Sequence, residues 1–139
     1  MQVLVVEDEA LIRMSICDLL EEAGFACAAA ANAREALALL DGGLRPGTLV
    51  TDFNLGPGPN GRALSTEALA RLPDLAVVHV TANPECVLEH GLRPRERVIA
   101  KPFEADELVQ AVLRLRPGRW FGGAACQAPA EMAAELLAR

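Results

Sequence analysis

The stretch that decides the fold is residues 3–8, which read Val-Leu-Val-Val-Glu-Asp. The four apolar residues are continuous and mostly β-branched, which is typical of a short strand buried on both faces. Two carboxylates, Glu7 and Asp8, follow that strand directly. A strand covered on both faces needs helices above and below it, so this opening predicts a layered α/β domain with acidic side chains at the end of its first strand.

Strand and helix patterns continue to alternate along the chain. Asn32 is a predicted helix N-cap, with Glu35 completing a capping-box pattern, and Gly24 is a predicted helix C-terminal cap. Further strands are expected at 25–30, 48–51, 76–80 and 97–100, and helices at 10–23, 33–40, 62–72, 105–115 and in a short segment that starts at Pro84. Five strands alternating with five helices predict a doubly wound, five-stranded parallel sheet.

Composition narrows the class of protein. A chain of 139 residues suits one domain, and a net charge of −6 argues against a nucleic-acid binder. The start has no signal-peptide pattern, and no apolar run is long enough to span a bilayer, so a cytoplasmic protein without membrane contact is expected. The four cysteines lack metal-binding spacing and are expected to be reduced thiols.

The repeating part ends near residue 116, which predicts a domain over 1–116 and a C-terminal extension over 117–139. The extension opens with Pro117-Gly118 and contains the single tryptophan, Trp120. Its segment 129–137 has the composition of a short extra helix. We expect this extension to pack back on the domain.

The chemically informative residues all follow predicted strands. Glu7 and Asp8 follow the first strand, Asp52 the third, Thr81 the fourth and Lys101 the fifth. In a doubly wound sheet these positions converge on one edge, where ligands bind. Three crowded carboxylates ionise together only if a positive charge lies among them. A hard divalent cation with oxygen ligands fits that requirement, and Mg²⁺ fits it best.

This arrangement is suited to phosphoryl transfer. Asp52 is the candidate nucleophile, which would form an acyl phosphate. Lys101 can contact one phosphoryl oxygen as a compact charge, and the Thr81 hydroxyl can donate to another. Ala82 is small and leaves space for the phosphoryl group. Pro102 is expected to fix the turn that aims Lys101, through a cis peptide bond.

Four short segments in this order resemble the receiver domain of two-component response regulators: Val5–Glu9, Val50–Leu55, Val80–Ala82 and Ala100–Phe103. The resemblance covers about residues 1–116. It implies a flavodoxin-like, three-layer fold. It also implies a stand-alone regulator similar to chemotaxis regulators, with a signalling function and at most slow autodephosphorylation.

The resemblance also implies roles for individual residues. Asp52 corresponds to the phosphoacceptor, and Thr81 and Lys101 to the switch hydroxyl and the lysine of the family. Asp8 corresponds to a direct ligand of Mg²⁺, for which Mn²⁺ is a possible substitute. The other metal contacts correspond to the carboxylate of Asp52, to Glu7, acting through water, and to the backbone carbonyl of Asn54.

The partners implied by the resemblance are proteins. The phosphoryl donor is a phosphohistidine on a sensor kinase or a histidine phosphotransfer protein, and the output is contact with a downstream protein. The regulator is expected to be a monomer or a phosphorylation-dependent dimer. The sequence departs from the family at Val98, where an aromatic switch residue is usual. We therefore expect the response to be carried by the backbone between Thr81 and Pro94.

Two other functions are open at this point. A haloacid-dehalogenase-like phosphohydrolase also uses an Asp nucleophile, Mg²⁺, Thr and Lys on a parallel sheet, but it has a second Asp where this chain has Asn54. A degenerate receiver would bind partners without phosphorylation. The complete acidic set argues against the degenerate receiver, whereas Val98 keeps it open.

Overall fold

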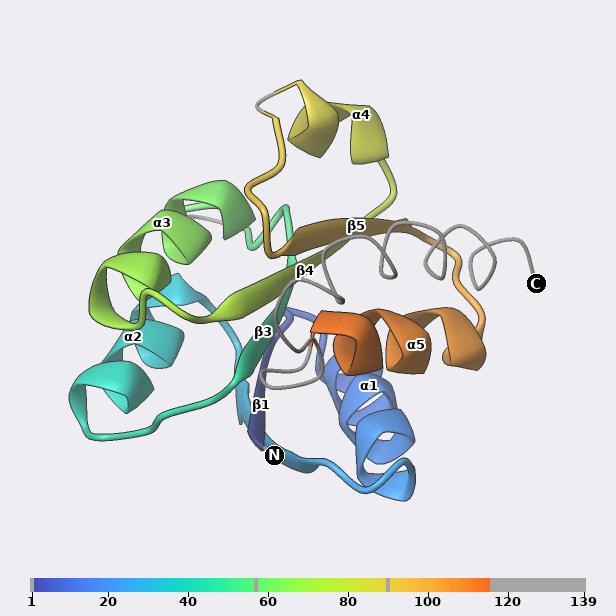
Figure 1. Cartoon of the computed structure of the whole chain (residues 1–139), viewed down its shortest axis with the longest axis horizontal. Coiled ribbons are helices and arrows are strands. Elements are labelled where there is room, and N and C mark those ends of the chain that lie inside the picture. The colour runs from blue at the N-terminus through green and yellow to red at the C-terminus, as the bar shows by residue number, and fades with distance from the viewer. Residues whose placement is uncertain (1, 57, 90, 116–139) are drawn as a thin grey trace, which may run out of the picture.

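The structure is a computed structural model that describes residues 2–56, 58–89 and 91–115. Strands and helices alternate strictly through this part of the chain (Figure 1). The elements are β1 Gln2–Val6, α1 Ala10–Glu22, β2 Ala26–Ala30, α2 Ala33–Asp41, β3 Thr48–Asp52, α3 Gly61–Arg71, β4 Ala76–Thr81, α4 Pro84–Leu88, β5 Glu96–Ala100 and α5 Ala105–Leu115.

The five strands form one parallel sheet in the order β2-β1-β3-β4-β5. Helices α1 and α5 cover one face of it, and α2 and α3 lie on the other (Figure 1). The predicted doubly wound, flavodoxin-like sandwich is therefore confirmed. The strand order reverses at β1 and β3, so their carboxyl ends border the crevice where such sheets bind ligands.

Strand β1 supplies both cores of the domain, as its unbroken apolar sequence predicted. Val3 and Val5 pack in the core beneath α1 and α5, while Leu4 and Val6 pack in the core beneath α2 and α3. Alternate residues of a strand point to opposite faces, so a strand between two helical layers has to be apolar at every position.

Local capping signals set the ends of the helices. The Asn32 side chain accepts a hydrogen bond from the Glu35 N–H at 2.8 Å, and the Glu35 carboxylate accepts one from the Ala31 N–H at 2.9 Å. This confirms the predicted capping pattern, with the second bond one residue before the cap. After α1 the chain reverses at Gly24, whose φ of +100° is a conformation that glycine adopts without strain.

Helix α4 is short, as predicted, and contributes little to the core. In this helix, all of which is described, only Val87 is buried. Figure 1 shows α4 apart from α3, at the end of the molecule beyond β5. The segment between β4 and β5 is therefore held by less apolar packing than the other crossovers.

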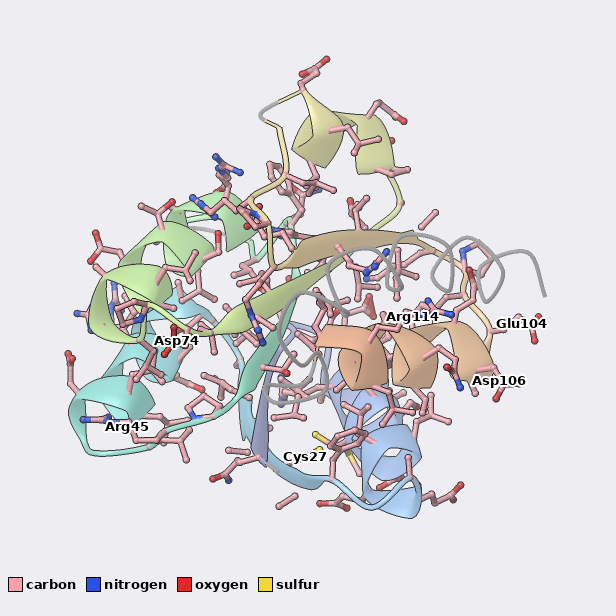
Figure 2. The ribbon with its side chains drawn as sticks, in the orientation of Figure 1. Cys27, Arg45, Asp74, Glu104, Asp106 and Arg114 are labelled. Carbon is pink, nitrogen blue, oxygen red and sulfur yellow. The ribbon has the colours of Figure 1, made fainter. Side chains whose placement is uncertain are left out.

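Cys17, Cys27 and Cys86 are free thiols within the described ranges. Cys27 faces α1 from β2, and its Sγ lies 3.8 Å from the Cys17 carbonyl oxygen (Figure 2). Burial raises the pKa of the Cys27 thiol to about 12, so this residue behaves as a small apolar group. The predicted extension over 117–139, with its helix and Trp120, lies outside the described residues. In the described part, no helix is both long and apolar enough to cross a membrane.

The cap of α2 gives a direct test of the local structure. Asn32→Ala should lower the free energy of unfolding by about 1 kcal/mol, because the Glu35 N–H loses its acceptor. Urea unfolding monitored by circular dichroism measures the change. Arg34→Ala, an exposed position in the same helix, is the control and should change stability far less. Equal losses in the two variants would contradict the role of the cap.

Candidate functional site

Acidic side chains from two strand ends meet at the carboxyl edge of the sheet. Glu7 and Asp8 follow β1, and Asp52 is the last residue of β3. One carboxylate oxygen from each lies within 4.8 Å of the others. The predicted convergence of these three residues is confirmed, and it follows from the parallel pairing of β1 with β3.

The three carboxylates differ in their exposure to solvent. Glu7 is buried, with 2% of its surface exposed, Asp52 is half-buried, and Asp8 is exposed. The Glu7 carboxylate accepts a hydrogen bond from the Glu9 N–H at 3.2 Å, and the Arg13 guanidinium donates to the Glu7 carbonyl oxygen at 2.7 Å. The turn after β1 is therefore fixed by α1, and it directs Glu7 inward beneath the two aspartates.

The side chain of Lys101, from the end of β5, lies between two of the carboxylates. Its Nζ is 3.0 Å from Asp52 Oδ2 and 3.2 Å from Glu7 Oε1. The peptide bond between Lys101 and Pro102 is cis, as the sequence predicted. Burial opposes the charged ammonium, but the hydrogen bond and charge of Asp52, reinforced by Glu7, raise the pKa of Lys101 overall. Part of the positive charge that the acidic cluster requires therefore comes from the chain itself.

One lysine does not balance three carboxylates. Burial, the hydrogen bond with Asp8 and the charge of Asp52 together raise the pKa of Glu7 from 4.5 to about 7, although the Glu9 N–H and the Lys101 ammonium act to lower it. Glu7 thus retains a proton well above the usual range of a carboxyl group. Hard oxygen donors with unbalanced negative charge are the ligand set that Mg²⁺ and Mn²⁺ take. The residues present therefore fit such an ion.

Thr81 ends β4 next to this cluster and is 1% exposed. Its backbone carbonyl accepts from the Lys101 N–H at 2.8 Å, which links the ends of β4 and β5. Its Oγ1 accepts from the Asn83 N–H at 3.0 Å, and no hydrogen bond among the described residues joins this hydroxyl to the carboxylates. Asn54 is exposed, and its N–H donates to Asp52 Oδ1 at 3.2 Å. Its carbonyl as a metal ligand stays a prediction.

Sequence reasoning missed one residue that shapes the site. The loop after Asp52 turns back so tightly that the Gly61 N–H donates to the Phe53 carbonyl at 2.7 Å. A Cβ on Gly61 would lie 2.4 Å from the Asp52 carbonyl oxygen, so no other residue fits without displacing the backbone of the site. Glycines at 56, 58 and 61 are typical of a loop, but the sequence gives no sign of which one contacts Asp52.

Comparisons with known proteins agree with this geometry. The family model of the response regulator receiver domain matches residues 3–113. The chain is 34% identical over 122 residues to the C4-dicarboxylate transport transcriptional regulatory protein DctD of Rhizobium meliloti, covering 84% of this chain and 25% of DctD. It also spans less than half of four further curated relatives.

Two solved structures resemble this one along nearly their whole length. A response regulator receiver protein from Sinorhizobium medicae superposes with a TM-score of 0.76 at 27% identity, covering 85% of this chain and 95% of that one. The response regulator protein TrrA from Thermotoga maritima, in complex with Mg²⁺-BeF, has a TM-score of 0.71 at 28% identity, covering 82% of this chain and 97% of TrrA.

The raised pKa of Glu7 predicts how stability depends on pH without divalent metal. Unfolded Glu7 loses its proton near pH 4.5, whereas folded Glu7 keeps it until about pH 7. The stabilisation from the protonated Glu7 is therefore complete below pH 4.5 and is lost as the pH rises to about 7, which lowers the free energy of unfolding by about 3 kcal/mol. Urea unfolding in EDTA across this range measures it. Glu7→Gln should remove this part of the pH dependence, and an unchanged slope would refute the assignment.

Removing the Lys101 ammonium group should increase the net repulsion among the three carboxylates. Lys101→Met should destabilise the protein in EDTA by about 1–3 kcal/mol, allowing for the partial exposure of the side chain. Adding Mg²⁺ should stabilise Lys101→Met more than the parent chain, because the ion supplies the missing charge. Thermal unfolding with and without Mg²⁺ tests this. An equal response of the two proteins to Mg²⁺ would contradict it.

Proposed function

The chain belongs to the response regulator receiver family, and from that premise we propose that it accepts a phosphoryl group on Asp52 from a phosphohistidine donor. Receiver domains receive phosphoryl groups from histidine kinases and act as signalling modules rather than as turnover enzymes. The observation that carries the proposal is the half-buried Asp52 carboxylate at the carboxyl edge of the sheet, 3.0 Å from the Lys101 ammonium and beside two further carboxylates.

The environments of the three acids assign the nucleophile. Glu7 is buried and keeps its proton to about pH 7, which makes it a poor nucleophile. Asp8 is exposed and has no ion pair with Lys101 among the described contacts. Asp52 combines partial exposure with a fixed position, because its Oδ1 accepts from the Asn54 N–H and its Oδ2 from Lys101. It is therefore the carboxylate best placed for in-line attack on phosphorus.

The transfer step exchanges one bond for another. An Asp52 oxygen forms a bond to phosphorus as the bond from phosphorus to the donor imidazole nitrogen breaks, and that electron pair returns to the imidazole. The product is an acyl phosphate on Asp52. The Lys101 ammonium then lies within reach of a phosphoryl oxygen. The Thr81 hydroxyl oxygen accepts a hydrogen bond from the Asn83 N–H, so the hydroxyl hydrogen stays available to donate to a second phosphoryl oxygen.

We propose that Mg²⁺, or Mn²⁺ in its place, is held by Asp8, Asp52 and the Asn54 carbonyl, with Glu7 contributing through water. When bound, the ion supplies positive charge that stabilises the phosphoryl oxygens during transfer. The fit of the donor set supports this, since three carboxylate oxygens lie within 4.8 Å and a single lysine leaves them unbalanced. The complex of TrrA with Mg²⁺-BeF supports the same choice of metal.

The partners are proposed by class. The donor is a sensor histidine kinase or a histidine phosphotransfer protein, and the output is phosphorylation-dependent contact with a downstream protein, by a monomer or a dimer. We propose this stand-alone mode for the receiver over 1–116. Family membership argues against the haloacid-dehalogenase alternative. The degenerate receiver is the remaining alternative, and the complete acidic set argues against it.

Chemical labelling separates these functions. Incubation with acetyl phosphate or phosphoramidate and Mg²⁺ should add one phosphoryl group by intact mass, and EDTA should prevent it. Asp52→Ala should abolish the added mass. Asp74→Asn is the matched control, because this exposed aspartate lies in the loop before β4, at the opposite edge of the sheet (Figure 2), and should label normally.

Two outcomes would overturn the proposal. Labelling of Asp52→Ala to the level of the parent chain would show that the acceptor is misassigned. Failure of the parent chain to label with any donor, together with retained partner binding, would favour a degenerate receiver. Steady turnover of small phosphate esters would instead favour the phosphohydrolase.

A further inference from the structure

A buried histidine lies directly behind the site. His79 of β4 has no exposed surface, and in the sheet register it lies between Thr51 of β3 and Val98 of β5. It precedes Thr81 by two residues, so both side chains belong to the same face of β4. Its Nε2 lies 3.2 Å from Glu96 Oε2, which places a polar pair inside the sheet where an apolar pair is the usual choice.

Glu96, the first residue of β5, accepts further hydrogen bonds. Its side chain is 1% exposed, and its Oε2 accepts from the Arg93 guanidinium at 2.6 Å while its Oε1 accepts from the Arg93 N–H at 2.7 Å. Burial opposes ionisation, but the hydrogen bonds from His79 and Arg93 outweigh it and lower the pKa of Glu96 to about 2. The carboxylate is therefore charged at neutral pH and held by directional bonds.

The contacts continue from Glu96 to the surface. The Arg93 guanidinium donates to Ser65 Oγ at 3.2 Å and to Thr66 Oγ1 at 2.7 Å, both on α3. Arg62 of α3 lies 3.8 Å from Glu96 Oε1 and donates to the Gly91 carbonyl at 3.1 Å. Together His79, Glu96, Arg93 and Arg62 form one cluster, the His79–Glu96 network, that joins β4, β5, α3 and the segment between α4 and β5.

The His79–Glu96 network holds a segment that buries few apolar side chains among its described residues. Helix α4 buries only Val87, and the chain that follows it to β5 is exposed at Gly91, Leu92 and Pro94. A hollow of about 510 Å³ adjoins the network, lined by residues that include Thr66, Leu69, Pro73, Arg93 and Pro94. The Arg93 side chain therefore has space to move into, unlike a side chain in a close-packed core.

We propose that the His79–Glu96 network is a conformational relay that transmits the phosphorylation state of the site at Thr81 to the surface formed by α3 and residues 91–95. The inference rests on the proposed function. When the Thr81 hydroxyl turns toward a phosphoryl oxygen, the end of β4 shifts and His79 shifts with it. Glu96 must then adjust its bonds to Arg93 and Arg62, so the segment between α4 and β5 moves relative to α3. Charged hydrogen bonds suit this role because they favour discrete arrangements.

Hydrogen exchange with and without a phosphoryl mimic tests the relay. The parent chain with BeF and Mg²⁺ should change its amide exchange in residues 84–95 by about fivefold or more. Arg93→Gln removes the guanidinium group at the outer end of the network. Glu96→Gln removes the charge of the central carboxylate and keeps nearly the same side-chain volume. Both variants should still label on Asp52, but the change in residues 84–95 should fall to less than half of the parent value.

Arg71→Gln is the matched control, because Arg71 lies on the same helix α3 and pairs instead with Asp41 and Glu67 at the surface. It should retain the full response. If Glu96→Gln does not fold, Arg93→Gln decides the outcome alone, since Arg93 is partly exposed and lies outside the core.

The outcomes separate the relay from the proposed function. Variants that label on Asp52 and keep the full exchange response in 84–95 would overturn the relay and leave the function intact. A parent chain that labels but shows no change in 84–95 would also overturn it. A parent chain that neither labels nor responds to BeF would contradict the proposed function, and the relay would fail with it.

Discussion

Three carboxylates held at one end of a parallel sheet have to be balanced by positive charge, and the rest of the site is arranged around that constraint. Parallel pairing of β1 with β3 brings Glu7, Asp8 and Asp52 within 4.8 Å of one another. The Lys101 ammonium neutralises part of this charge, and a proton retained on Glu7 relieves more of it. The negative charge that is left unbalanced is consistent with the proposed binding of a divalent cation at this edge.

The same constraint gives three chemically similar residues different roles. Depth in the sheet decides which carboxyl keeps its proton, because burial disfavours the charged form. Glu7 is deepest and titrates near neutrality, while Asp52 is half-buried and paired with Lys101. Gly61 lets the loop after β3 close against the backbone of Asp52, the proposed acceptor, while the Asp52 carboxylate stays partly exposed. Rigid placement of a partly exposed nucleophile is what group transfer requires.

The segment between β4 and β5 is attached to the domain by a different kind of interaction from the other helices. Four helices attach through apolar side chains, whereas α4 buries one residue and its segment depends on charged hydrogen bonds that reach His79. Apolar packing is non-directional and tolerates small shifts, while a buried carboxylate with several donors changes state in discrete steps. Among the described crossovers, the segment with little apolar attachment is thus held by polar contacts that reach His79, two residues before Thr81.

The sequence by itself determined the elements, their order and the composition of the acidic edge. Apolar runs, helix periodicity and the Asn32 cap act over a few residues, so they are readable locally, and strand-end positions converge in any doubly wound sheet. Only the tertiary structure decided that Lys101 pairs with Glu7, 94 residues away, that Gly61 touches Asp52, and that His79 meets Glu96. These contacts join residues far apart in the chain, and their geometry depends on the register, twist and loop closure of the whole fold rather than on any local pattern.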